Sequence, residues 1–240
     1  MAVASPVLEI DSVIKPYGGL RPLRLQRLIV QPGERVGIAG VDQTMAEVFV
    51  NLVTGATLPE QGSIHLAGRA TSAIADSADW LATVDRFGIV SERVVLLEQF
   101  TLAQNIAMSL TLDLEPLADD VRQQVDVLGG EVGLDPNALT ARAGDVGAAS
   151  RLRTRLGRAI ATNPSTLLVE HPAVNLTPQE IESVAGDMAR LSQARNLAIV
   201  VLSATPDLGR AFVERMLVLN AATGALTEQK RGVLGRLFGR

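Results

Sequence analysis

The chain has 240 residues, 47% of them hydrophobic and 20% charged, which fits one large or two small folded domains and excludes disorder over most of the chain. The net charge of −4 disfavours sequence-independent nucleic-acid binding, because that binding needs a strong basic field. The chain contains no cysteine, which excludes a disulfide framework, a thiolate zinc site and a cysteine nucleophile.

The sequence shows no run of about 20 apolar residues of the kind that spans a bilayer. Its first residues, MAVASPVLEID, lack the basic start and apolar run of a signal peptide. We therefore expect a soluble protein of the cytoplasm.

The first third of the chain predicts strands and one strand–loop–helix unit. Apolar and polar residues alternate near positions 8–10 and 23–25, which is typical of half-buried strands. Residues 35–40 form a short apolar run ending in glycine, as expected for a strand covered on both faces. Apolar residues at helical spacing follow over residues 45–53. A further strand is expected at residues 62–68.

A buried strand and a first short helix are expected next. Residues 87–90 have the apolar character of the strand. Thr101 and Gln104 have the spacing of a capping box, which predicts that a helix begins there.

Two longer helices are expected in the middle of the chain. The first covers residues 117–134, and we expect Gly129 and Gly130 to break it. The second covers residues 148–162. One face of this second helix is basic, which favours a solvated face, and its residues are Arg151, Arg155 and Arg158.

The last third of the chain returns to alternating strands and helices. Residues 166–170 and 197–203 are apolar runs typical of buried strands, and Thr177 with Glu180 predicts a capped helix between them. A hairpin around residues 223–224 is expected to follow. Apolar strands that alternate with helices predict an α/β fold with a largely parallel sheet. The antiparallel start and the helical middle predict a β subdomain and a helical subdomain.

We expect a single domain over residues 1–228, with the helical subdomain at about residues 93–162. Residues 229–240, which include KRGVLGRLFGR, form a basic amphipathic tail. Such a segment suits an anionic membrane surface, and the alternative is a tail that is frayed or docked on its own domain.

Several sequence blocks occur in an order that is typical of one protein family. They are YGG at residues 17–19, PGERVGIAG with the helix and NLVTG that follow, LPEQGSIHLAGR, FTLAQNI, and LGRAIATNPSTLLVEHP. Over roughly residues 7–228 the chain resembles the ATP-binding cassette family, the nucleotide-binding subunits of ABC transporters. The resemblance implies a P-loop NTPase-like core with a mostly parallel sheet.

The segment that corresponds to the phosphate-binding loop lacks the groups that bind phosphate. In the family this loop reads G-x-x-x-x-G-K-[ST]; its amides cradle phosphate, its lysine reaches the β- and γ-phosphates, and its hydroxyl holds magnesium. Here Met45 replaces the second glycine, Ala46 the lysine and Glu47 the hydroxyl. We expect Met45 to crowd the phosphate path, and Asp42 and Glu47 to cap the helix in place of phosphate. The eight positions are Gly40, Val41, Asp42, Gln43, Thr44, Met45, Ala46 and Glu47.

The other family motifs depart in the same direction. Glu92 holds the position of the Q-loop glutamine, Glu170 that of the Walker B aspartate, and His171 that of the catalytic glutamate. The signature motif reads VGAAS at residues 146–150, and Ala204 stands where the switch histidine is expected. The resemblance therefore implies a nucleotide-type site whose chemistry is missing, with Glu170 and His171 at the degenerate catalytic positions.

Tyr17 corresponds to the aromatic residue that stacks on adenine, and a surface aromatic in a loop is the equal alternative. The family fold brings Glu47, Glu92 and Glu170 together around the magnesium position. Such a cluster could hold a divalent ion without nucleotide, but we favour an arginine–carboxylate network. We expect no cofactor, with ATP and magnesium as the alternative.

The resemblance implies a degenerate ABC-type subunit that binds an integral membrane permease at the inner face of the membrane. It would act as a structural or regulatory partner, as a homodimer or as a heterodimer with an active cassette, and without nucleic acid. Residues 94–106 correspond to the surface that receives the permease's coupling helix, and the alternative is that the apolar run at residues 94–97 simply belongs to the core. An active ATPase with a divergent nucleotide site and a soluble regulator that reuses the fold remain alternatives.

Overall fold

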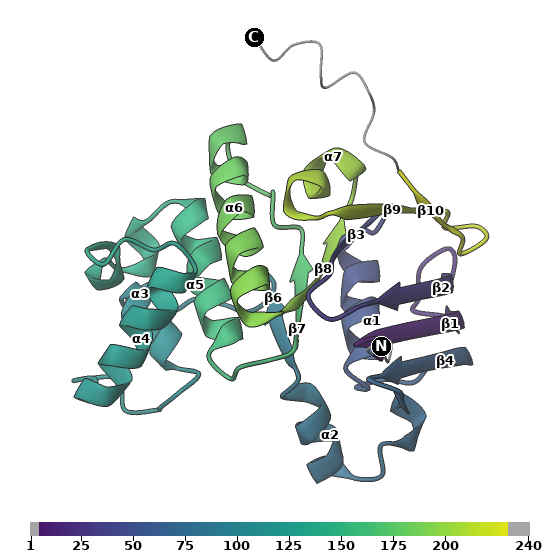
Figure 1. Cartoon of the computed structure of the whole chain (residues 1–240), viewed down its shortest axis with the longest axis horizontal. Helices are drawn as coiled ribbons and strands as arrows, with labels where there is room; N and C mark the ends of the chain where they lie inside the picture. Colours follow the sequence, from purple (N-terminus) through teal and green to yellow (C-terminus); the bar gives the residue numbers. More distant parts are fainter. Residues whose placement is uncertain (1–4, 230–240) are drawn as a thin grey trace.

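The structure, a computed structural model, describes residues 5–229. The expected basic tail at residues 229–240 lies outside this range except for Gln229. Figure 1 shows three parts side by side: an antiparallel sheet on the right, a larger sheet in the centre, and a group of helices on the left. The strands are β1 (Leu8–Lys15), β2 (Leu23–Val30), β3 (Arg35–Ala39), β4 (Gln61–Leu66), β5 (Arg69–Ala70), β6 (Phe87–Val90), β7 (Thr166–Glu170), β8 (Ala198–Ser203), β9 (Arg215–Leu219) and β10 (Leu226–Glu228). The α-helices are α1 (Gln43–Val53), α2 (Ser77–Val84), α3 (Leu102–Ala107), α4 (Asp119–Glu131), α5 (Ala148–Ile160), α6 (Pro178–Arg195) and α7 (Pro206–Gly209).

The two sheets have the strand directions that the sequence predicts, an antiparallel sheet and a largely parallel one. The smaller sheet has the order β2-β1-β4-β5 and is antiparallel throughout. The larger sheet has the order β10-β9-β3-β8-β7-β6, in which only β10 runs antiparallel to its neighbour. The expected mixed α/β fold is therefore confirmed.

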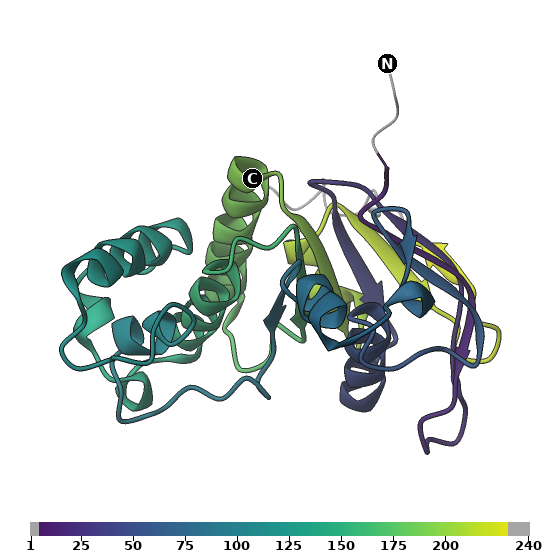
Figure 2. The same cartoon turned by 90° about the horizontal axis from the view of Figure 1, so that it is seen from below.

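The larger sheet is buried on both faces, which explains its apolar strands. Every residue of β7 and β8 is buried. Because side chains alternate along a strand, Leu167 and Val169 enter one apolar cluster and Leu168 enters the other. The first cluster includes residues of α3, α4, α5 and α6, whereas the second includes residues of α1 and of the antiparallel sheet. Figure 2 shows the helical group and the antiparallel sheet on opposite sides of the molecule.

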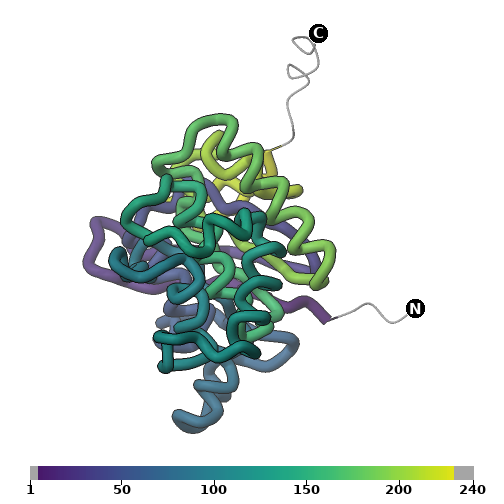
Figure 3. The backbone as a smooth tube through the Cα atoms, turned by 90° about the vertical axis from the view of Figure 1, so that its left-hand side faces the viewer, coloured from purple at the N-terminus to yellow at the C-terminus, as the bar shows by residue number. Residues whose placement is uncertain are grey.

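Helices α3, α4 and α5 form a helical segment between β6 and β7. Figure 3, viewed from the helical side, shows this segment in front of the strands. Among residues 5–229, no helix combines the length and apolar character needed to cross a membrane.

Two details of the helices differ from expectation. Helix α4 continues through Gly129 and Gly130 instead of breaking there. A Cβ atom at Gly129 would lie 3.1 Å from the side chain of Leu139, so this glycine allows close packing inside a continuous helix. Helix α2 was not predicted, because it has only eight residues and its apolar residues do not form a buried face; only Thr83 is buried in it.

Both expected capping boxes are confirmed, at Thr101 with Gln104 and at Thr177 with Glu180. In the second box the backbone N–H of Thr177 donates to the Glu180 carboxylate over 2.8 Å, and the Glu180 N–H donates back to the Thr177 hydroxyl over 3.3 Å. Two hydrogen bonds lower the pKa of Glu180: the larger effect comes from the backbone N–H of Thr177 and the smaller one from its hydroxyl.

We expect Thr177→Ala to lower the free energy of unfolding by about 1 kcal/mol, because it removes the cap of α6. Glu180→Gln should reveal the charge contribution. Because the pKa of Glu180 is lowered on folding, its stabilisation is present above the unfolded pKa and lost as the pH falls through the folded pKa. Urea unfolding from pH 7 to pH 3 should show the wild-type chain losing its advantage over Glu180→Gln, and a pH-independent difference would contradict this account.

Candidate functional site

The candidate site lies where the carboxyl ends of adjacent parallel strands meet at one edge of the central sheet. Strands β3, β8, β7 and β6 are neighbours and run parallel, so the loops that follow β3, β6 and β7 emerge together. Ligands of open α/β sheets bind at this kind of edge. The segments that follow these strands carry residues 40–47, of which 43–47 begin α1, together with residues 91–98 and 171–177, and they include most positions that the sequence singled out.

The loop after β3 keeps a special backbone conformation. Gly40 has a φ of 84°, which favours glycine, and an added Cβ atom would lie 3.0 Å from the carbonyl oxygen of Leu219. The amide of Gly40 donates to the carbonyl oxygen of Ala204, just beyond β8, over 3.2 Å, and that of Val41 donates to the carbonyl oxygen of Ser203, the last residue of β8, over 3.1 Å. The turn between β3 and α1 is therefore held by hydrogen bonds within the chain.

A carboxylate of the chain caps α1 at the point where a phosphate would bind. The backbone N–H of Met45 donates to the Asp42 side chain over 2.8 Å. This confirms the expected cap by Asp42, and no such bond is formed by Glu47, whose side chain turns elsewhere. Met45 and Ala46 are both buried in the core. The expectation that Met45 crowds the phosphate path is therefore wrong, because Met45 packs inward.

The Glu170 carboxylate is the centre of the site. Its side chain is only 1% exposed, at the end of β7. Three side chains donate to it: the Ser91 hydroxyl over 2.7 Å, the Gln43 amide over 2.9 Å, and the guanidinium of Arg93 through Nε over 3.3 Å and through Nη2. A buried carboxylate is tolerated when it is paired and hydrogen bonded, and here both conditions are met.

Arg93 also reaches the helix after the phosphate-type loop. Its Nη1 lies 3.5 Å from Oε1 of Glu47. The hydrogen bond with Glu170 raises the pKa of Arg93, against the lowering effect of burial, and the charges of Glu170 and Glu47 add to the increase. The expected arginine–carboxylate network is thus present, and Arg93 supplies its cation.

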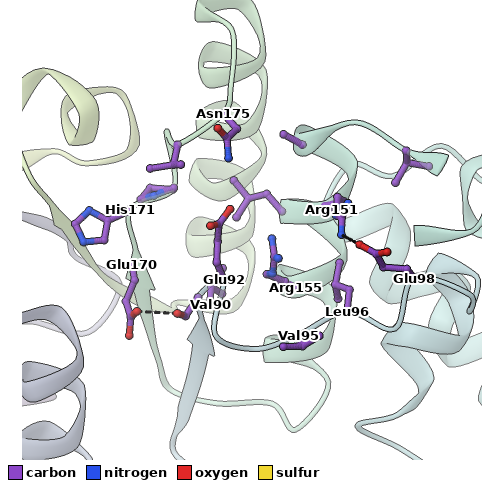
Figure 4. Close-up of a pocket in the computed structure, with 16 residues that line it drawn as sticks. Val90, Glu92, Val95, Leu96, Glu98, Arg151, Arg155, Glu170, His171 and Asn175 are labelled. Atoms are coloured by element: carbon purple, nitrogen blue, oxygen red, sulfur yellow. Dashed lines mark hydrogen bonds and ion pairs between the residues drawn. The ribbon is translucent and has the colours of Figure 1, made fainter. Parts of the chain in front are cut away.

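The three carboxylates that were expected to share a metal ion, those of Glu47, Glu92 and Glu170, are not grouped to do so. Glu47 and Glu170 both contact Arg93, whereas Glu92 lies between Glu170 on one side and Arg155 on the other (Figure 4) and has no ion pair with Arg93. Within residues 5–229 there is no group of three or more His, Asp or Glu side chains placed to hold a metal ion. Where the resemblance places magnesium, the guanidinium of Arg93 lies beside Glu47 and Glu170 in place of the third carboxylate.

His171 occupies a strained position next to Glu170. Its φ is 47°, a conformation that is uncommon for residues other than glycine. Its amide donates to the carbonyl of Leu202 over 2.8 Å, and its Nε2 is buried without a hydrogen-bond partner among the described residues. No carboxylate or hydroxyl therefore orients this imidazole as a base.

Two cavities show which predicted residues come together. An open hollow of about 600 Å³ joins Tyr17 with the loop after β3, including Asp42 and Thr44. Partial burial, and then the charge of Asp42, raise the pKa of Tyr17. A smaller cavity of about 290 Å³ lies among the loops and is lined by Asp42, Gln43, Glu92, Glu170, His171, Val174 and Ala204.

A groove of about 510 Å³ separates the loop after β6 from α5 (Figure 4). Apolar side chains, including Val95, Leu96 and Leu152, form part of its lining. Val95 is 66% exposed whereas Leu96 is 2% exposed, so the apolar run at residues 94–97 belongs partly to the core and partly to the surface.

The basic face of α5 is not a solvated face, which corrects the sequence-based interpretation. Arg155 donates through Nε to the carbonyl of Val94 over 3.3 Å, and Arg158 donates to the carbonyl of Val95 over 2.9 Å. Burial lowers the pKa of both arginines. At Arg155 the charge of Glu92 raises the pKa, whereas the charges of Arg151 and Arg158 lower it further. Arg151 pairs with Glu98 over 3.0 Å. The three arginines thus hold the segment that follows β6.

Sequence reasoning missed Arg93 and Ser91 as site residues. Both flank Glu92, the position to which the family motif drew attention. The available signal was a cation beside a family position in a chain whose only lysines are Lys15 and Lys230. The spacing of the motif could not say which of the two neighbouring side chains, Glu92 or Arg93, turns toward Glu170.

No family model matches the chain. It is 28% identical to the lipoprotein-releasing system ATP-binding protein LolD of Psychrobacter arcticus over 193 residues, which are 80% of this chain and 84% of that protein. It is also 28% identical to the methionine import ATP-binding protein MetN of Brucella abortus over 220 residues, which are 91% of this chain and 58% of that protein.

Solved structures with the same fold agree with these relatives. The chain superposes on cbiO1 of Clostridium perfringens, part of the ABC transporter complex cbiONQ, with a TM-score of 0.78 and 14% identity over 93% of this chain and 87% of that one. It superposes on the ATP-binding cassette MJ0796, in a dimer bound to ADP and Pi, with a TM-score of 0.73 and 20% identity over 94% of this chain and 99% of that one. The fold is that of an ABC cassette.

We expect Ser91→Ala to lower the free energy of unfolding by about 1–3 kcal/mol, because the buried Glu170 loses one of its donors. Ser77→Ala, at an exposed serine of α2, is the matched control and should be close to neutral. Guanidinium unfolding of the three chains measures the difference. Equal stability of the two variants would show that the Ser91 hydroxyl contributes nothing to the network.

Proposed function

We propose that this chain, a member of the ATP-binding cassette family, is the ATP-binding-type subunit of a membrane transport complex that contributes structure or regulation instead of ATP hydrolysis. The observation that carries the proposal is the Asp42 carboxylate, which accepts the Met45 amide at the start of α1. A helix N-terminus attracts anions through its free amides and its dipole. Here an anion of the chain itself already holds that place.

The charges around the loop argue against a bound triphosphate. Asp42 and Glu47 would repel it, and Ala46 offers no charge in place of the lysine. Arg93 is the cation that contacts the network, and its guanidinium is engaged by Glu170 and Glu47. ATP with magnesium therefore does not fit the residues present, since binding would require Arg93 to give up both carboxylates.

The groups that would perform hydrolysis are also absent. Phosphoryl transfer depends mainly on positioning and on neutralising charge around the phosphoryl group. His171 has no partner that orients it, Ala204 cannot contact a phosphate through a hydrogen-bonding side chain, and Glu170 is saturated by donors. The chain thus keeps the cassette fold without a set of groups for the reaction.

The names of the relatives support a transport complex as the setting. LolD belongs to a lipoprotein-releasing system, and MetN is a methionine import protein. We infer that this chain likewise works with an integral membrane permease, on the inner face of the membrane, and forms a homodimer or pairs with an active cassette. The exposed Val95 in the groove beside α5 gives the permease an apolar contact.

Two other functions make different demands on the site. An active ATPase would need Arg93 to replace the missing lysine, which requires it to leave the buried Glu170 unpaired; such a loss is costly. A soluble regulator would need no membrane partner and would leave Val95 without a role. The contacts of Arg93 and the exposure of Val95 favour the first proposal over both.

We expect the purified wild-type chain to release no phosphate from ATP and to show no change in melting temperature with ATP and magnesium. The physical reason is the pairing of Asp42 with α1 and of Arg93 with Glu170. Phosphate release and thermal melts measure both properties, with an ABC cassette of known activity as the positive control. Turnover that copurifies with the chain and disappears in Glu170→Gln would favour the active ATPase.

We expect Val95→Asp to reduce the fraction of the chain that sediments with native membranes, because a carboxylate would enter an apolar contact. Val127→Asp on α4 is the matched control, since Val127 is also exposed, at 57%, and lies outside the groove. Quantitative immunoblotting of membrane and soluble fractions measures the effect. Equal membrane fractions for both variants would remove Val95 from the permease surface, and no membrane fraction for the wild type would favour a soluble regulator.

A further inference from the structure

We propose that the Arg93 guanidinium acts as a built-in cation that replaces the metal of a nucleotide site and ties the helical segment to the core at all times. The inference rests on the proposed function, because it assumes that no nucleotide fills the site. It goes further in assigning a mechanical role to one residue.

The first step is that Arg93 lies on one element of the chain and contacts two others. Glu47 lies on α1, Glu170 ends β7, and Arg93 stands on the segment that leads from β6 to α3. The guanidinium contacts both carboxylates, whose positions correspond to the metal-binding hydroxyl and aspartate of the family. A single cation therefore joins the same two elements that a bound metal would join.

The second step is competition for the same oxygen atoms. Oε1 of Glu170 accepts from Nη2 of Arg93, and Oε2 accepts from Nε of Arg93, from Ser91 and from Gln43. A guanidinium presents its donors in a planar fork that matches a carboxylate, which a lysine ammonium does not. Because both oxygens of the buried carboxylate already accept hydrogen bonds, a divalent ion at Glu170 would have to compete with these donors and with the charge of Arg93.

The third step is the connection from Arg93 to the helices. One and two residues beyond it, the carbonyls of Val94 and Val95 accept hydrogen bonds from Arg155 and Arg158 of α5. Further along, the fully buried Asn105 of α3 accepts the Leu97 amide over 2.8 Å and donates to the Leu97 carbonyl over 3.0 Å. The segment is thus fixed to α3 and α5 on one side and, through Arg93, to Glu170 on the other.

The consequence is that the orientation of the helical segment does not depend on a ligand. A contact within the chain is present at every ligand concentration, whereas a metal or nucleotide contact varies with concentration. A ligand can shift an equilibrium only if it binds the two states differently. With its binding groups occupied by Arg93, the chain offers nucleotide no such difference.

The absence of cysteine in the chain allows a direct test. Cysteines at two exposed positions, Arg27 on β2 and Asp126 on α4, can carry spin labels without other reactive thiols. Pulsed electron paramagnetic resonance then measures the distance between the antiparallel sheet and the helical segment. The full chain is compared with Arg93→Ala, Arg93→Lys and the control Arg69→Ala, which removes a bidentate arginine pair with Asp79 far from the site.

We expect one distance in the labelled wild-type chain, unchanged by ATP, magnesium or manganese. Arg93→Ala should show a second, shifted population, and Arg93→Lys an intermediate one because an ammonium lacks the fork. Arg69→Ala should match the wild type. Manganese should raise the melting temperature of Arg93→Ala and not that of the wild type, because Glu47 and Glu170 are no longer paired with Arg93 and can bind the ion.

An unchanged single distance in both Arg93 variants would overturn the inference. So would a wild-type melting temperature that rises with manganese as much as that of Arg93→Ala. If Arg93→Ala fails to fold, Arg93→Lys decides, since it keeps the charge. ATP turnover by the wild type would instead overturn the proposed function while leaving the distance result to be judged separately.

Discussion

The burial of one carboxylate constrains the whole site. Glu170 ends β7, a fully buried strand of the larger sheet, with its side chain 1% exposed, and an unpaired charge at such a position would be strongly destabilising. Gln43 from α1, Ser91 from the end of β6 and Arg93 from the following loop each bring a donor to it. Because these donors come from elements far apart in the chain, satisfying Glu170 also fixes how those elements are arranged. The geometry of the site therefore follows from the requirement to neutralise one buried group.

The fold and the chemistry of the family depend on different parts of the sequence. Parallel strands buried on both faces require apolar runs such as β7 and β8, and the turn before α1 requires Gly40 at a positive φ. None of these needs a lysine, a magnesium ligand or a catalytic base. The cassette fold can therefore persist when Ala46 and His171 stand at the chemical positions, provided that other side chains satisfy the groups left at the strand ends.

Local signals predicted the elements well, because strands such as β7 and the boxes at Thr177 and Thr101 depend on neighbouring residues alone. Features set by tertiary contacts escaped prediction. Helix α4 passes through Gly129 because Leu139 packs against it, and the arginines of α5 turn to carbonyls of a distant loop. An arginine–carboxylate network was expected at the site, but the sequence did not identify Arg93 as the arginine that forms it. Which of Glu92 and Arg93 faces Glu170 depends on the exit angle of one loop, and no sequence period encodes that angle.

The loop after β6 links the site to the groove beside α5, where Val95 is exposed. Arg155 and Arg158 donate to the carbonyls of Val94 and Val95, which leaves the side chain of Val95 at the surface. Burying two guanidiniums is unfavourable, as the lowered pKa of each indicates, so this contact requires the loop to stay in place. Arg93, at the start of the same loop, holds it through Glu170. The exposed side chain of Val95 and the ion pair of Arg93 with Glu170 thus belong to one segment that its contacts hold in place.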